Sequence, residues 1–163
     1  AAYQAWQDGR LTDDEFEQAL ATTVAAANSR AATLADLALT AAVTLALRRA
    51  VVPLGLLPPP GDRDRLLRAA GTLRAVLDAT GDPLGRVARL GRAEPLTTAA
   101  RAYSDGMARR DEVTGWTRNL SASACQLCRW WWRDGRTWPA DHPMPTHKGC
   151  TCTPVPVTKE SAA

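Results

Sequence analysis

The sequence predicts a mainly α-helical fold, in which a long N-terminal helix and a helical bundle precede a small α+β module at the C-terminus. Alanine, the strongest helix former, occurs 31 times in the 163 residues, against a single phenylalanine. Neither proline nor glycine occurs from Arg10 through Val52, so nothing in this stretch breaks a helix. From about Val113 onward, β-branched and aromatic residues mix with polar ones, which is typical of strands. All four cysteines and five of the six tryptophans lie in this last part of the chain.

The long helix is expected over residues 13–50, as one helix or as two collinear helices. Thr12 and Glu15 have the spacing of a capping box at its start. An apolar stripe follows helical spacing along it: Phe16, Leu20, Val24, Ala27, Ala31, Leu34, Ala38 and Leu45. From Leu34 onward both faces are apolar, which predicts burial there. Such a helix would reach about 55 Å, more than a compact domain of this size needs, so we expect part of it to pack on another subunit.

Proline and glycine divide the middle of the chain. A Pro-rich linker is expected at residues 53–62, followed by a helix over about 63–79. Two further helices are expected to begin at Pro83 and near Pro95, because proline is favoured in the first turn of a helix.

Two strands are expected in the last part of the chain, at residues 113–120 and 152–157. The prolines of the second strand confine it to the edge of a sheet. Together the expected elements define three regions: a helical arm with its Pro-rich linker (1–60), a helical region (61–112) and a β-containing module (113–163).

The spacing of the cysteines and of one histidine in this module indicates a metal site. Cys125 and Cys128 form a Cys-x2-Cys pair, the spacing at which two thiolates reach one tetrahedral metal ion. His147 and the Cys150–Cys152 pair, whose sulfurs point to one face of an extended segment, can supply the other positions. We predict a structural zinc ion, because protein side chains would fill every position and leave none for a reacting water molecule.

Five candidate ligands for four positions leave one spare. The Cys-x2-Cys pair and the histidine, with one cysteine of the last pair, rank above a set of four cysteines, and His142 is a weaker sixth candidate. Two disulfides or four reduced thiols are the other interpretations. The N-terminal residues show no secretory-signal pattern, which makes disulfides less expected.

A segment rich in tryptophan and arginine lies inside the same module. It supplies six candidate interface residues: Trp130, Trp131, Trp132, Trp138, Arg129 and Arg133. Such a segment can stack on nucleic-acid bases. Tryptophan and arginine also anchor protein interfaces, and the rings can cover a metal site. We prefer the second interpretation, a cover for the metal site or a protein interface.

Charge and motifs argue against several classes of protein. The net charge of +3 divides into −2 over residues 1–60 and +5 over 61–163, a bias below that of a dedicated nucleic-acid-binding protein. Neither a nucleophile elbow, a zinc-protease helix nor a phosphate-binding glycine loop occurs, so no catalytic residue is assigned. The apolar run at 31–47 is short for a membrane-spanning helix and contains Asp36, so no membrane association is expected.

Two segments of the module, GWTRNLSASACQLC and HPMPTHKGCTCTPVPV, resemble the C-terminal signature of Mu F-like minor head proteins of tailed bacteriophages, most closely those of phages that infect actinobacteria. In that family a Gly-Trp-x-Arg strand precedes Cys-x-x-Cys, and Met-Pro-x-His-x-x-Cys-x-Cys closes the signature. The matching positions here are Gly115, Trp116, Arg118, Cys125, Cys128, Met144, Pro145, His147, Cys150 and Cys152. The N-terminal stretch is similar too, though less specifically.

This resemblance implies a few-copy virion protein, made in the host cytoplasm and packaged inside the head near the portal. Its implied roles are head morphogenesis and the packaging or delivery of DNA, with the portal protein or the major capsid protein as partner. Non-specific contact with packaged DNA and self-association through the long helix are further expectations. Related proteins are often labelled capsid maturation proteases, so a protease is one alternative function. A DNA-binding zinc module is the other.

Overall fold

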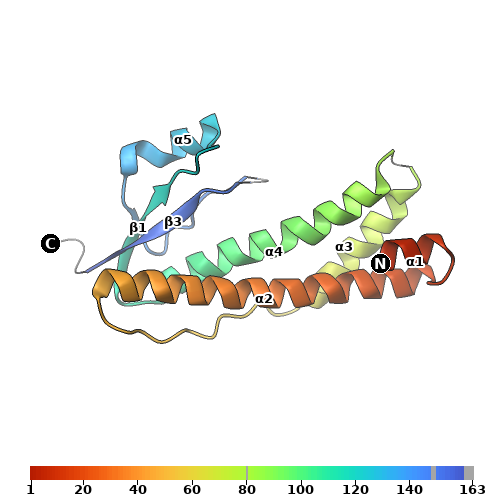
Figure 1. Ribbon diagram of the computed structural model, residues 1–163, viewed down its shortest axis with the longest axis horizontal. Helices are drawn as coiled ribbons and strands as arrows, with labels where there is room; N and C mark the ends of the chain where they lie inside the picture. The colour runs from red at the N-terminus through yellow and green to blue at the C-terminus, as the bar shows by residue number, and fades with distance from the viewer. Residues whose placement is uncertain (80, 148–149, 160–163) are drawn as a thin grey trace. The chain divides into compact units, whose positions relative to one another are not determined.

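The computed structural model describes residues 1–79, 81–147 and 150–159 (Figure 1). It confirms the predicted fold class, because most of the chain is helical and a small antiparallel sheet lies near the C-terminus. The elements in chain order are α1 (Ala2–Gln7), α2 (Asp13–Leu47), α3 (Asp62–Leu77), α4 (Pro83–Ala108), β1 (Val113–Asn119), α5 (Gln126–Trp132), the 3-10 helix η1 (Arg133–Gly135), β2 (Trp138–Pro139) and β3 (Thr153–Thr158).

The chain divides into two compact units, and each unit is built from two separate segments. The first unit comprises Ala1–Ala31 and Pro58–Thr98, and the second comprises Ala32–Leu57 and Ala99–Ala163. Helices α2 and α4 each contribute residues to both units. This division differs from the three consecutive regions predicted from the sequence, 1–60, 61–112 and 113–163. The difference arises because each long helix finds packing partners from distant parts of the chain.

The first unit packs α1, α3, the first half of α2 and the first part of α4 around one apolar core. Phe16, Leu20 and Val24 of α2 meet Leu66 and Leu77 of α3 in it. The predicted capping box is present, since the Thr12 backbone N–H donates to the Glu15 carboxylate at 2.8 Å and the Glu15 backbone N–H donates to the Thr12 hydroxyl at 3.3 Å.

Helix α1 was not expected from the sequence. Its Trp6 ring stacks on Phe16 at a centroid distance of 5.0 Å. A six-residue helix carries too few residues for a periodic pattern and depends on tertiary packing for its stability. Contact with α2 therefore explains why these residues are helical.

The buried face of α2 follows the predicted stripe only through Val24. It continues through Asn28, Ala32, Ala35, Leu39, Val43 and Leu47. The predicted burial of both faces from Leu34 onward is not found within the chain, because Leu34 is 66% exposed and Leu45 78%. The prediction failed because it followed apolar residues alone, whereas the inner face also carries buried polar residues, Asn28 and Asp36.

Asp36 is a charged residue on the buried face of α2, and its partners explain why it can be buried. Its carboxylate accepts hydrogen bonds from the backbone N–H groups of Leu54, Gly55 and Leu56, at 3.0, 2.7 and 3.2 Å. It also lies 3.9 Å from the guanidinium of Arg110, which is buried as well. The Pro-rich segment is thus fastened to α2 by the buried carboxylate.

Helix α4 is one helix and not the two predicted to begin at Pro83 and near Pro95. Pro95 lies inside it. A proline in a helix removes one backbone hydrogen bond, a loss that packing can offset. Leu90, before Pro95, packs into the core of the first unit, and Met107, after it, into a core of the second.

The sheet belongs to the second unit and has the strand order β2-β1-β3, with both pairs antiparallel. The prediction that the proline-rich strand lies at an edge is confirmed, since β3 pairs with β1 alone. Gly115 of β1 pairs with Pro139, and a Cβ at this position would collide with the Trp138 carbonyl and Thr137. The short strand β2 can therefore approach β1 only because residue 115 is glycine.

Within the described residues, α2 is also a helix long and apolar enough to cross a membrane, judged by length and composition. A buried core helix passes the same test. Asn28 donates to Asp62 at 2.8 Å and Asp36 accepts three backbone hydrogen bonds, so these two buried polar residues of α2 pair with other parts of their own units.

Candidate metal centre

Helix α5 begins at the Cys-x2-Cys pair. Cys125 is the N-cap residue of α5, in an extended conformation, and Cys128 lies in its first turn. Residues three apart near a helix start project from the same side, so the two thiols lie close together. Cys128 is buried and Cys125 is exposed, so the pair extends from the interior of the second unit to its surface.

The segment between β2 and β3 brings the other candidate ligands to this pair. The Nε2 atom of His147 lies 3.2 Å from the Sγ of Cys125 and 3.0 Å from the Sγ of Cys128. The Sγ of Cys150 lies 3.5 Å from that of Cys128. The five predicted ligands form two overlapping groups, one with His147 and one with Cys150 and Cys152, and Cys128 belongs to both.

These separations are close to those of a zinc site. Zinc bonds of about 2.3 Å to sulfur and 2.0–2.1 Å to nitrogen place tetrahedral ligand atoms about 3.5–3.8 Å apart. All four cysteines are free, so the alternative of two disulfides does not describe this structure. The cluster could therefore hold a metal ion.

The comparisons with known proteins leave this cluster as the chief guide to function. No family model, curated protein or solved structure matches the chain. What the centre does must therefore be argued from its own residues.

The thiols of the cluster have different proton affinities. Burial raises the pKa of Cys128 to about 12, and the neighbouring Cys150 and Cys152 act in the same direction. The backbone N–H of Cys128 lowers the pKa of Cys125. Burial also opposes ionisation of Cys152, but hydrogen bonds from Ser121 outweigh it and lower the pKa. Several thiols this close cannot all ionise without a cation, and a metal ion that binds here would displace their remaining protons.

Two side chains that were not among the predicted ligands or interface residues complete the inner wall of the cluster. The buried guanidinium of Arg118, in β1, lies 4.0 Å from the Sγ of Cys128 and also donates to the Pro145 carbonyl. The hydroxyl of Ser121 lies 3.8 Å from the Sγ of Cys152. A signal for Arg118 does exist in the sequence, because strand alternation places it on the same face as Trp116.

His142, the weaker sixth candidate, does not belong to the cluster. Its ring stacks on Trp138 at a centroid distance of 4.7 Å. Its carbonyl accepts a hydrogen bond of 2.7 Å from the indole N–H of Trp116. His142 and Trp138 therefore extend the core around Trp116, and Trp138 belongs to that stack rather than to the Cys/His cluster.

The remaining interface candidates divide between the two faces of α5. Trp131 points inward, since its ring lies 6.2 Å from that of His147. Trp130 is 58% exposed, and the guanidinium of Arg133 lies 4.6 Å from its ring centroid. Trp132 and Arg129 are exposed too, and Arg129 donates to the Ala124 carbonyl at 3.2 Å. One tryptophan thus covers the cluster, while the others leave an aromatic and cationic surface on α5.

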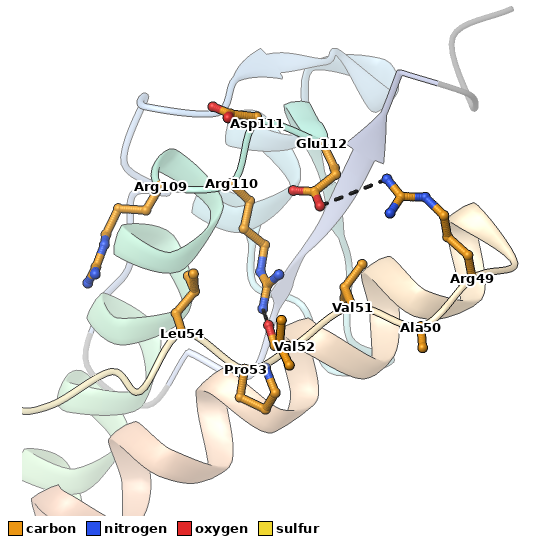
Figure 2. Close-up of a pocket in the computed structure, with 10 residues that line it drawn as sticks. All are labelled: Arg49, Ala50, Val51, Val52, Pro53, Leu54, Arg109, Arg110, Asp111 and Glu112. Atoms are coloured by element: carbon orange, nitrogen blue, oxygen red, sulfur yellow. Dashed lines mark hydrogen bonds and ion pairs between the residues drawn. The ribbon is translucent and has the colours of Figure 1, made fainter.

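A cavity elsewhere in the second unit shares no residue with the cluster (Figure 2). It has a volume of about 340 Å³ and is lined by residues 49–54 and 109–112. Arg110 donates to the Val52 carbonyl across it, and Arg49 lies 3.9 Å from Glu112. The lining therefore mixes arginines with acidic residues and shows no selective charge.

Proposed function

We propose that the chain is a structural minor head protein of a tailed bacteriophage, and that its C-terminal module folds around one zinc ion. The observation that carries the proposal is the cluster of Cys125, Cys128, His147, Cys150 and Cys152. The five donors come from two segments of the chain and lie close together in two groups that share Cys128. They are among the residues on which the resemblance to minor head proteins rests.

We assign the ligands to Cys125, Cys128, His147 and Cys150. The first three form one group, and Cys150 approaches the shared Cys128 to 3.5 Å. Cys152 has a separate hydrogen-bond partner in Ser121, which supports its assignment as the spare thiol. Four protein ligands leave no open coordination position, so the zinc holds segments together and takes no part in hydrolysis.

The need for such an ion follows from how little the module can bury. β2 has two residues and α5 seven, so neither supplies an extensive apolar face. A bound metal compensates for a small core by linking α5 to the segment before β3.

The exposed surfaces of the second unit support a role in assembly inside the virion. Leu34, Leu37 and Leu45 form an exposed apolar face of α2, and Trp130 with Arg133 forms an exposed aromatic and cationic surface on α5. Aromatic and arginine side chains anchor protein interfaces. The portal protein or the major capsid protein is the partner in this proposal, with non-specific contact to packaged DNA, and assembly takes place in the host cytoplasm.

Two measurements test the proposal. Elemental analysis of the purified chain is expected to find about one zinc per chain. Co-expression with the portal and major capsid proteins of the same phage is expected to yield a complex that Trp130→Ser or Leu45→Ser weakens. Leu96→Ser is the matched control, because Leu96 is an exposed leucine of the first unit.

Other results would redirect the assignment. Specific cleavage of the major capsid protein by the purified chain would favour a maturation protease. Tight binding to duplex DNA with a steep salt dependence would favour a DNA-binding zinc module. A chain that binds neither head protein would contradict the proposed role in assembly.

A further inference from the structure

We infer that Arg118 is the charge-balancing residue of the metal centre. In this assignment its guanidinium neutralises the net negative charge of a zinc ion bound by three thiolates and one imidazole. The inference rests on the zinc site proposed above and adds to it a residue outside the ligand set.

Arg118 is a buried charge, and it therefore needs a negatively charged partner. The residue is 2% exposed, and none of the ion pairs among the described residues includes it. A buried charge without a counter-charge is strongly unfavourable, because it loses its hydration and gains no partner. A guanidinium cannot escape this cost by losing its proton. A negative group must therefore lie nearby when the module is folded.

The surroundings of Arg118 identify that group. One terminal nitrogen lies 4.0 Å from the Sγ of Cys128, and the other donates to the Pro145 carbonyl. The centre of the guanidinium lies 5.4 Å from the centroid of the Trp131 ring. The carbonyl and the indole ring are neutral, so within the described part of the chain the sulfur of Cys128 is the contact of Arg118 that can carry negative charge.

The charges of the centre favour the same assignment. A zinc ion with three thiolates and one neutral imidazole carries a net charge of −1, whereas four thiolates give −2. One guanidinium balances the first set and leaves the second with an uncompensated buried charge. Arg118 therefore favours the set that includes His147 over a set of four cysteines.

A second buried arginine of the same unit provides a matched comparison. Arg110 is 6% exposed, and like Arg118 it has a buried Nε without a hydrogen-bond partner. It lies 3.9 Å from the carboxylate of Asp36 and donates to the Thr40 hydroxyl at 2.8 Å. Arg110 thus has an acidic partner in the protein itself, which Arg118 lacks among the described residues.

The test measures metal affinity in the full chain. Zinc is titrated in competition with a chromophoric chelator, and cobalt(II) serves as a spectroscopic probe of the bound thiolates. Arg118→Gln is expected to lower the zinc affinity about 10- to 100-fold, the usual effect of losing a side chain that supports a metal ligand. Arg110→Gln is expected to lower stability and leave the zinc affinity unchanged.

Arg118→Lys separates charge from packing and also covers the case in which Arg118→Gln does not fold. Lysine keeps the charge and loses the planar fork, so its zinc affinity is expected to fall by less than about tenfold. Its cobalt spectrum is expected to retain the thiolate-to-metal absorption of the wild type. A loss of affinity as large as that of Arg118→Gln would contradict charge balance.

The outcomes distinguish the two proposals. If the wild-type chain binds neither zinc nor cobalt, the metal centre itself is wrong and the role of Arg118 falls with it. If the wild type binds zinc and Arg118→Gln binds it equally well, the metal centre stands and the role of Arg118 is overturned. A loss of affinity in Arg110→Gln equal to that in Arg118→Gln would also overturn it, because it would reveal a general effect of instability.

Discussion

The Nε2 atom of His147 lies 3.0 Å from the Sγ of Cys128, although the two residues are 19 positions apart in the sequence. The contact joins helix α5 to the segment that precedes β3. It is also the point at which the cluster can be tested most directly, since Cys128 belongs to both groups of candidate ligands.

Replacing Cys128 by serine is expected to abolish zinc binding and unfold the C-terminal module, because every candidate set of four ligands loses a member. Cys152→Ser is the matched control. It removes a second buried thiol and is expected to retain about one zinc per chain. Elemental analysis of both variants checks this, and loss of zinc in Cys152→Ser alone would contradict the ligand assignment.

Removal of the metal by a chelator is expected to unfold the module while leaving most helices intact. The core of the first unit consists of side chains from helices and contains none of the cysteines. Tryptophan fluorescence is expected to change, because Trp116, Trp131 and Trp138 lie in the module, while the far-ultraviolet circular dichroism keeps most of its helical signal. Because the thiols must lose protons to bind zinc, less chelator is expected to suffice at lower pH. Fluorescence unaffected by the chelator would argue against a structural metal.

We expect the buried phenol of Tyr103 to make the protein less stable at alkaline pH. Burial raises the pKa of its phenol, so the folded state holds this proton more tightly than the unfolded state. The stabilisation is fully present below the unfolded pKa of about 10 and is lost as the pH rises through the higher folded value. Denaturant unfolding is measured as the pH rises past about 10. The free energy of unfolding is expected to fall less in Tyr103→Phe than in the wild type. Equal losses in the two proteins would contradict this.

Loss of the Asp36 carboxylate is expected to destabilise the second unit strongly. Asp36→Ala would leave three backbone N–H groups without their acceptor and the buried Arg110 guanidinium without its acidic partner. Removing one partner of a buried ion pair costs about 3–5 kcal/mol. The control is Asp105→Ala, which breaks an exposed ion pair with Arg101 and is expected to cost less than about 1 kcal/mol. Denaturant unfolding measures both, and similar free-energy losses would show that Asp36 is not a fastening point.

The resemblance and the ligand spacing together predict the five residues that the fold brings into one cluster. The Cys-x2-Cys pair is a local pattern, so its two thiols were certain to lie near each other. The choice between His142 and His147 was not local. It depended on the path of the chain after β2, where Trp116 and Trp138 take up the ring of His142.

Helix α2 also shows that local patterns predict local features and miss those that depend on distant residues. Its start at the capping box follows from neighbouring residues and was predicted correctly. Its buried face was predicted correctly only where apolar residues form it, and the prediction was wrong where Asn28 and Asp36 are buried. A polar residue is buried when a distant partner satisfies it, and no hydrophobic pattern can reveal that partner.

The sequence by itself determined the local features of this protein: the start of the long helix, the edge position of the proline-rich strand, the fold class and the set of candidate ligands. Only the tertiary structure decided that α4 continues through Pro95, that the Pro-rich segment is fastened to Asp36, and that Arg118 faces Cys128. The physical reason is the distance along the chain over which the interactions act. Capping, backbone preference and ligand spacing act between neighbours along the chain, whereas burial of a charge or a proline depends on partners that folding brings from far away.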